Sequence, residues 1–388
     1  MKPVLLMASF AWLVWTSGCA PLASPPTDES ATLRDVRQMT SGFARAGEAY
    51  FSSDMEWVVF QAVPSGEEHY AMYLARTKRE QGRIVGLDKP VRISPPGSRN
   101  TCGHFSPDGR SLIFASTAGQ EDPSVPGSGY QRQGRDYRWS FPAGMEIFRA
   151  DGWQAAVAAA DADRGINLAV HRLTRNVGYD AEGSFSPDGR WIVFSSSRDD
   201  VPNEQRSRPT ELMTAEPTSV PSSRPNLELY VMRADGNDVV RLTNQPGYDG
   251  GPFFSPDGKR LVYRSDRQGN DLLQVYVADV VFDASGRIIG LSNERRLTDD
   301  ANVNWGPYWH PGGRHVIYAS SVHGHTNYEL YMVRVDGKRR CRITFTDGAD
   351  VLPVFSPDGK LLLWTSKRTS DKTTQLFLAD FEMPEYLE

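Results

Sequence analysis

Short apolar runs recur along the chain, and each one follows a turn-forming segment. Runs of this density are typical of β-strands that are covered on both faces. Further along each unit, apolar and polar residues alternate up to an Asp-Gly pair, as in 228–236 and 329–337. This alternation predicts additional strands with one face toward a core. The clearest apolar runs are 112–114, 191–194, 316–318 and 361–364.

The turn before each run has a recurring sequence: an aromatic residue, Ser, Pro, Asp and Gly. In such a turn Pro presets φ, Asp caps the backbone, and Gly accepts a left-handed conformation, so the motif predicts a tight hairpin. Four clear copies begin at Phe105, Phe185, Phe254 and Phe355, and two degenerate copies begin at Phe51 and Trp309. We call these six residues the motif aromatics.

A basic, an apolar and a hydroxyl residue end each unit, and mark its fourth strand. Six units of four antiparallel strands predict an all-β fold, a six-bladed β-propeller. The fourth strand of the last unit is missing at its own end, but residues 35–40 fit the signature. We therefore predict that this N-terminal strand completes the last blade and closes the ring. The signatures lie at 92–94, 172–174, 241–243, 296–298 and 342–344, and the predicted blades at 45–94, 100–174, 180–243, 249–298, 304–344 and 350–381 with 35–40.

These motifs resemble the TolB-like, or PD40-type, WD40-like propeller repeats of bacterial envelope proteins. The likeness covers about residues 35–381, and the stretches 178–182, 247–252 and 304–307 look like a TolB-related lipoprotein group. The resemblance implies a β-propeller in the cell envelope that acts through protein binding.

The first segment, 1–19, is an expected signal peptide. A basic start and an uncharged apolar run lead to Thr16-Ser17-Gly18-Cys19, which resembles the lipobox of bacterial lipoproteins. We expect lipidation of Cys19, although Thr16 departs from the aliphatic residue usual there; ordinary cleavage nearby is the alternative. Ala20 fits sorting to the outer membrane, and 20–34 reads as a flexible tether before the propeller at 35–388. The remaining cysteines, Cys102 and Cys341, fall in distant blades, so two free thiols are expected.

Composition narrows the class of partner. Hydrophobic residues make up 39% of the chain, enough for a globular core. The chain has 43 basic and 48 acidic residues, a formal net charge of −5 at pH 7, so nucleic acid is an unsuitable partner. We expect a monomer on the periplasmic side of the envelope.

Five Asx residues stand five positions before a motif aromatic, and Glu182 follows closely. We label the strands of each blade A to D from the axis outward. The D-to-A loops should then carry these residues as a ring around one mouth of the channel. Three interpretations stay open: turn capping, contact with a partner peptide, or a bound cation such as calcium. The residues are Asn100, Asp180, Asp249, Asn304 and Asp350.

Three insertions interrupt the repeats. Residues 118–143 and 198–225 lie between strands B and C, and so should overhang the Asx face. The first holds an interface-like mixture of aromatic and Arg residues, including Tyr130, Arg135, Tyr137 and Trp139, which we expect to contact a partner. The third, 153–168, is Ala-rich and is expected to contain a short helix on the opposite face.

Catalytic signatures are absent from the sequence, which has no nucleophile elbow, zinc helix, phosphate loop or Cys-x-x-Cys pair. The favoured hypothesis is a non-catalytic envelope lipoprotein that binds a protein or peptide and needs no cofactor. The alternative is a carbohydrate- or peptide-processing propeller, a lyase or hydrolase, with a metal or carboxylate site at the channel mouth. A sensor of a small ligand in the channel is a third possibility.

Overall fold

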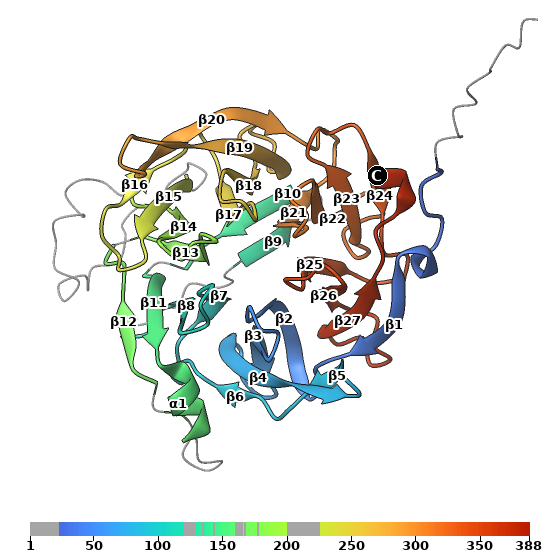
Figure 1. The fold of residues 1–388 in the computed structure, drawn as a ribbon, viewed down its shortest axis with the longest axis horizontal. Helices are drawn as coiled ribbons and strands as arrows, with labels where there is room; N and C mark the ends of the chain where they lie inside the picture. Colours follow the sequence, from blue (N-terminus) through green and yellow to red (C-terminus); the bar gives the residue numbers. More distant parts are fainter. Residues whose placement is uncertain are drawn as a thin grey trace, which may run out of the picture.

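The computed structural model describes residues 23–119, 129–133, 136–142, 144–159, 166, 168–176, 178–199 and 226–388. The predicted six-bladed β-propeller is confirmed: six antiparallel sheets stand around a common axis (Figure 1). Only one short α-helix, α1 (Trp153–Ala158), occurs in this part of the chain.

The blades follow one another along the chain, and in each the first strand lies at the axis. From the axis outward, blade one consists of β2 (Phe43–Phe51), β3 (Trp57–Pro64) and β4 (Ala71–Glu80) with β5 (Arg83–Leu87) and β6 (Val91–Arg92), and blade two of β7 (Asn100–Phe105), β8 (Ser111–Ser116), β11 (Glu146–Asp151) and β12 (Val170–Arg172). Blade three consists of β13 (Asp180–Phe185), β14 (Trp191–Ser196), β15 (Glu228–Arg233) and β16 (Val240–Arg241), and blade four of β17 (Asp249–Phe254), β18 (Arg260–Ser265), β19 (Gln274–Phe282) and β20 (Ile288–Arg296). Blade five consists of β21 (Asn304–Trp309), β22 (His315–Ser320), β23 (Glu329–Arg334) and β24 (Arg340–Arg342), and blade six of β25 (Asp350–Phe355), β26 (Leu361–Ser366), β27 (Gln375–Phe381) and β1 (Leu33–Gln38).

The motif serine organises the turn between the first two strands of a blade. Ser106 Oγ donates to Asp108 Oδ1 at 2.7 Å and accepts from the Ser111 N–H at 2.9 Å. Because one side chain joins both ends of the turn, it fixes the register of the hairpin. The same pair of bonds forms at Ser52, Ser186, Ser255 and Ser356. In blade five His310 replaces the serine, and its Nδ1 accepts from the Gly312 N–H at 3.1 Å.

The hydroxyl residue of the fourth-strand signature has one structural role in all six blades. Its oxygen accepts a hydrogen bond from a backbone N–H of the third strand, at 2.9–3.0 Å. Thr40 makes this bond in blade six, with the Leu376 N–H, as the sequence signature predicts. The six residues are Thr40, Ser94, Thr174, Thr243, Thr298 and Thr344.

The predicted closure is confirmed by the pairing of β1 with β27. Leu33 lies opposite Phe381 and Gln38 opposite Phe377, so the strand begins two residues before position 35. Docking extends further toward the N-terminus, since the Glu29 carboxylate accepts from Arg368 at 2.7 Å. The segment expected as a tether up to residue 34 is therefore held to blade six from Glu29 onward.

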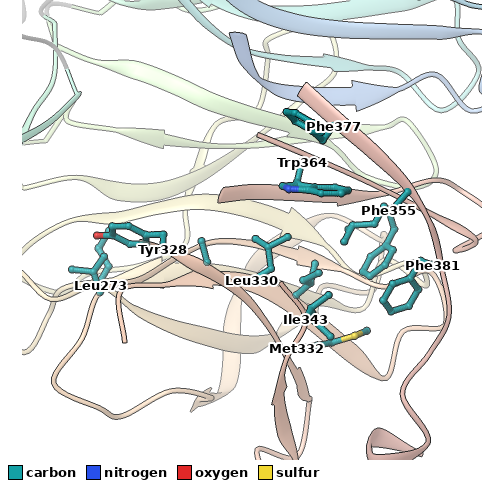
Figure 2. Close-up of a cluster of buried hydrophobic side chains, with 14 of the residues drawn as sticks. Leu273, Tyr328, Leu330, Met332, Ile343, Phe355, Trp364, Phe377 and Phe381 are labelled. Atoms are coloured by element: carbon teal, nitrogen blue, oxygen red, sulfur yellow. The ribbon is translucent and has the colours of Figure 1, made fainter. Parts of the chain in front are cut away.

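The core lies between neighbouring blades. Figure 2 shows Trp364 and Phe377 of blade six near Leu330 and Ile343 of blade five, and all four side chains are buried. Each sheet thus covers its neighbour, as the dense apolar runs predict. Cys102 and Cys341 are free thiols, as expected.

The insertions differ in what the structure describes. In the first, β9 (Gly129–Gln133) and β10 (Asp136–Ser140) form a two-stranded hairpin. In the third, the expected helix is α1, which Trp153 anchors by packing against Trp57 at 5.2 Å between ring centroids. Residues 200–225 of the second insertion lie outside the described residues.

Removing a buried side chain from the closing strand β1 should destabilise the whole ring. Leu33 is 4% exposed and packs with Phe355 and Phe381, so Leu33→Ala should cost about 2–5 kcal/mol of unfolding free energy. Val36 in the same strand is 37% exposed, and Val36→Ala should cost about 0.5 kcal/mol or less. Urea unfolding measures both; equal midpoints for the two variants would contradict closure by β1.

Candidate functional site

A cavity of about 360 Å³ lies on the propeller axis. The innermost strands of all six blades contribute to its wall, through Glu48, Cys102, Glu182, Gly251, Gly306 and Leu352 among others. Loop residues between strands B and C, or D and A, complete it: Glu68, His69, Tyr70, Arg99, Phe141 and Pro142. The cavity therefore lies toward the face on which the sequence placed the Asx ring and the long insertions.

One backbone feature repeats six times around this cavity. In every innermost strand, the third residue before the motif aromatic has φ between 43° and 59°, and a β-bulge interrupts the ladder there. A bulge turns the side chain away from the regular alternation, which brings this position to the cavity wall. Four of the six are not glycine, and positive φ is uncommon for such residues. The positions are Glu48, Cys102, Glu182, Gly251, Gly306 and Leu352.

Aromatic side chains fill the axis on the inner side of the bulges. Tyr50, Phe253 and Tyr308 directly precede motif aromatics, and their ring centroids are 5.0–6.2 Å apart although they come from blades one, four and five. His104 joins them, 5.4 Å from Tyr50, and burial lowers its pKa to about 4, so the imidazole is neutral. This layer forms the floor of the cavity.

Glu182 is held by a dense set of donors. Its carboxylate accepts from Tyr248 Oη at 2.5 Å, from the Gly251 N–H at 2.6 Å and from Arg264 at 3.0 Å. Burial alone would lower the Arg264 pKa, but the Glu182 charge and the contacts with Tyr248 together raise it, and the net shift is upward. Arg264 is therefore cationic, and it is committed to Glu182.

Two glycines make room for this pair. A Cβ on Gly251 would lie 2.1 Å from an Arg264 guanidinium nitrogen, and one on Gly250 would lie 2.5 Å from Glu182 Oε2. No side chain fits at such distances, so the Gly-Gly pair in 247–252 is explained by the side chains that it admits.

Glu48 lies in the same cavity with much weaker partners. Its carboxylate accepts from the hydroxyls of Tyr50 and Thr101, both at 3.3 Å, and it forms no ion pair with any residue that the structure describes. Burial raises the pKa of Glu48, and the Glu182 charge adds to this. Burial, with the Glu48 charge next, also raises the pKa of the neighbouring Cys102 thiol well above its usual value, so this thiol is a poor nucleophile.

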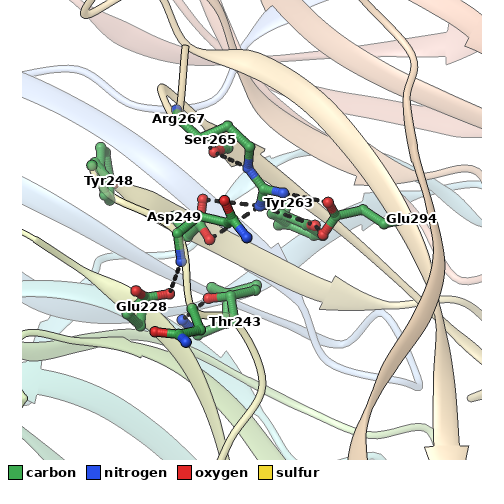
Figure 3. A network of polar contacts seen from close by, with 12 residues as sticks. Glu228, Thr243, Tyr248, Asp249, Tyr263, Ser265, Arg267 and Glu294 are labelled. Atoms are coloured by element: carbon green, nitrogen blue, oxygen red, sulfur yellow. Dashed lines mark hydrogen bonds and ion pairs between the residues drawn. The ribbon is translucent and has the colours of Figure 1, made fainter. Parts of the chain in front are cut away.

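The predicted Asx ring lies at the cavity end of the blades, but its members are buried first residues of the innermost strands, not loop residues. Each aspartate pairs with an arginine of its own blade: Asp180 with Arg198, Asp249 with Arg267 and Asp350 with Arg368, at 2.8–3.2 Å. Figure 3 shows Arg267 between Asp249 and Glu294. Among the predicted site residues whose side chains the structure describes, Asn100 and Glu182 lie at the cavity wall and the other four do not.

The spacing of these pairs was a readable signal in the sequence. Each arginine follows its aspartate by 18 positions, whereas Ala118 and Val322 stand there when the residue is Asn100 or Asn304. The asparagines bond neutral groups instead: Asn100 Nδ2 donates to the Tyr70 carbonyl at 3.0 Å, and Asn304 Nδ2 donates to Gln274 at 3.1 Å. That these residues bind a ligand stays a prediction. No cluster of three or more His, Cys, Asp or Glu side chains in the described ranges is arranged to hold a metal.

The predicted partner-contact loop directly precedes residues of the cavity wall, and its contact with a partner stays a prediction. Tyr130 lies in β9, Tyr137 and Trp139 lie in β10, and Arg135 falls outside the described residues. In Figure 1 this hairpin is drawn across the middle of the ring. Just after β10, Phe141 packs on Tyr179 and Tyr248, with ring centroids 5.0 and 4.8 Å apart. The first insertion thus supplies part of the cavity wall.

Comparison with known proteins supports a TolB-like propeller. No family model matches the chain. A stretch of 154 residues is 28% identical to a TolB homologue of Chlorobium luteolum, covering 39% of this chain and 31% of the relative. A stretch of 205 residues is 25% identical to the Tol-Pal system protein TolB of Francisella tularensis, covering 52% of this chain and 38% of the relative. The matches therefore span less than half the length of these curated relatives.

A solved structure extends the likeness to almost the whole fold. A protein assigned as TolB from Agrobacterium tumefaciens superposes with a TM-score of 0.51 over 87% of this chain and 91% of its own. Sequence identity is 18%, so this comparison shows the shared propeller fold alone.

Burial of Asp249 should make the stability of the folded protein depend measurably on pH. Burial raises its pKa to about 6 although Arg267 opposes the shift, so the folded state binds this proton more tightly than the unfolded state. The stability of the wild type relative to Asp249→Asn should therefore fall as pH rises from about 4 to about 6, and then level off. Urea unfolding across this range measures the difference.

Asp108 provides a control of opposite sign. Its hydrogen bond from Ser106 lowers its pKa, so its contribution should be lost as pH falls, and Asp108→Asn should show the reverse trend. A pH-independent difference for Asp249→Asn would contradict the assigned burial.

Proposed function

We propose that this protein is a lipid-anchored envelope protein, on the periplasmic side of the outer membrane, whose propeller binds a protein or peptide partner at the cavity face. The observation that carries the proposal is the cavity itself, because all six blades and the first insertion contribute to one wall. Several aromatic side chains line that wall, and aromatic residues are enriched where proteins recognise one another. Relatives named TolB, one of them a Tol-Pal system protein, support a partner in the envelope.

The proposal includes a non-catalytic role. Asp180, Asp249 and Asp350 are each paired with an arginine, and the Cys102 thiol is a poor nucleophile because its pKa is raised. Binding through shape and hydrogen bonds needs neither group free. No helix in the described residues is long and apolar enough to cross a membrane, and the proposed anchor is the lipid on Cys19.

One observation favours an enzyme as the alternative. Glu48 and Glu182 line one cavity in different surroundings: burial raises the pKa of Glu48, whereas Glu182 accepts a hydrogen bond from Arg264. Two carboxyl groups in different surroundings are the arrangement on which acid–base pairs are built. Product formation from a panel of polysaccharides or peptides that is lost in Glu48→Gln would favour this alternative over the binding role.

Partner contact should be restricted to one face. A photo-crosslinking residue at His69, beside the cavity, should capture an envelope protein in intact cells, whereas one at Lys259, exposed in an A-to-B turn on the opposite face, should not. Gel shifts followed by mass spectrometry identify the adducts. Identical captured proteins from both positions, or none from His69, would contradict the proposed binding face.

If a lipid on Cys19 anchors the protein, replacing this cysteine should remove the protein from the membrane fraction of the cells. In Cys19→Ala cells the protein should lose labelling by an alkyne fatty acid and should leave the sedimenting membrane fraction, since the acyl chains supply the membrane affinity. The Cys102→Ala variant, changed at a cysteine inside the fold, should keep the label. Retained labelling in Cys19→Ala would show that anchoring occurs elsewhere.

A further inference from the structure

The cavity holds two acceptors that no donor of the described chain satisfies fully. Glu48 has two long hydroxyl contacts and a hydrogen bond with the weakly donating Cys102 thiol, and no ion pair within the described residues. Gln61, on β3, is 7% exposed and lines the same cavity, and its Oε1 has no hydrogen-bond partner in the part of the chain that the structure describes. A buried acceptor without a donor is destabilising, so the pair points to a ligand that donates hydrogen bonds.

The two acceptors are neighbours because the strands that carry them are paired. Gln61 lies opposite Gly47 in the β2–β3 ladder, and Glu48 is the bulge residue that follows Gly47. The Glu48 N–H donates to Thr365 Oγ1 of blade six at 3.0 Å, which fixes the bulge. A Cβ on Gly47 would lie 3.0 Å from the same oxygen, so the backbone is packed closely against blade six here.

The charges around Glu48 distinguish a cation from an anion. Arg264 lines the cavity, but it is bound to Glu182 and also lies over the Tyr248 ring at 5.3 Å. Arg45, nearer the mouth, lies over the Tyr70 ring at 4.7 Å. Three arginines line the cavity, Arg45, Arg99 and Arg264, and among the described residues none of them forms an ion pair with Glu48. A ligand cation would therefore meet a carboxylate that has no ion-pair partner in the described chain.

Aromatic rings complete the arrangement. Tyr50 and Tyr308 on the floor, and Trp305 on the wall, surround the space with π-faces and hydroxyls. Cations are stabilised over such rings, and ammonium ions are recognised in cavities lined with them. A primary ammonium also has three N–H donors, which match a carboxylate and an amide oxygen.

We infer that the cavity binds a primary ammonium group, as carried by a peptide N-terminus or a lysine side chain, at Glu48 and Gln61. This inference rests on the proposed function, because it specifies which group of a partner enters the cavity. The ammonium donates to the Glu48 carboxylate and to Gln61 Oε1 while the rings of the floor contact its carbon chain. Binding supplies the positive charge that the buried carboxylate lacks, which offsets the cost of ionising it there.

Calorimetric titration of the full chain with three probes tests this. Alanyl-alanyl-alanine amide carries a free N-terminus, its N-acetyl form does not, and N-acetyl-lysine methylamide carries only a side-chain amine. At least one amine probe should bind, and acetylation of the tripeptide should not improve its affinity. Binding by the free tripeptide identifies an N-terminal group, and binding by the lysine derivative identifies a side chain.

Substitutions link the binding to the two acceptors. Glu48→Gln keeps the size of the side chain but removes the charge and one of its two acceptor oxygens, so affinity for the bound amine should fall by about tenfold or more. Gln61→Leu should weaken it several-fold. Glu67→Gln, the matched removal of an exposed charge from a residue outside the cavity lining, should change affinity by about twofold at most.

Three results would overturn the inference: no binding of either amine up to about 10 mM, equal or better binding of the acetylated peptide than of both amines, or unchanged affinity in folded Glu48→Gln protein. Cross-linking at His69 in the Glu48→Gln background separates this from the proposed function. If the amine probes fail while His69 still captures its partner, the inference is wrong and the proposed function stands. If the face-specific capture itself is absent, the proposed function is wrong.

Discussion

The antiparallel pairing of β1 with β27 is the contact on which the rest of the structure depends, because it joins the first and last blades into a closed ring. Closure leaves no open sheet edge between them and fixes the axis toward which the innermost strands point. The candidate site lies beside this junction: the bulge of Glu48 in blade one is bound to Thr365 in blade six. A loosened closing strand would therefore disturb the cavity as well as the stability.

The two cavity carboxyl groups show how one repeated backbone feature serves different chemistry. Glu48 and Glu182 occupy equivalent bulges, yet Glu182 has a buried guanidinium and Glu48 has two neutral hydroxyls. The difference comes from the neighbouring blades, where Gly250 and Gly251 admit Arg264 beside Glu182. The fold thus supplies six equivalent positions, and the residues around each position decide whether it is paired within the chain or left for a ligand.

The fold was predictable because its signals are local and repeated six times. The turn serine, the fourth-strand hydroxyl and even the closing Thr40 each act within a few residues or one blade. The site was less predictable because it depends on burial and on contacts between blades. The sequence placed the Asx residues at the correct end of the blades, but their arginine partners stand 18 positions away. Glu48 and Gln61 could not be recognised as site residues, because the cavity that they line exists only in the closed ring.

The most direct measurement is a crystal structure of the full chain with alanyl-alanyl-alanine amide or N-acetyl-lysine methylamide bound. The account predicts a closed ring with β1 on β27, and the ligand nitrogen at hydrogen-bond distance, about 2.7–3.2 Å, from both Glu48 and Gln61. A ligand amine held elsewhere, or a lysine or arginine of the chain itself paired with Glu48, would contradict it.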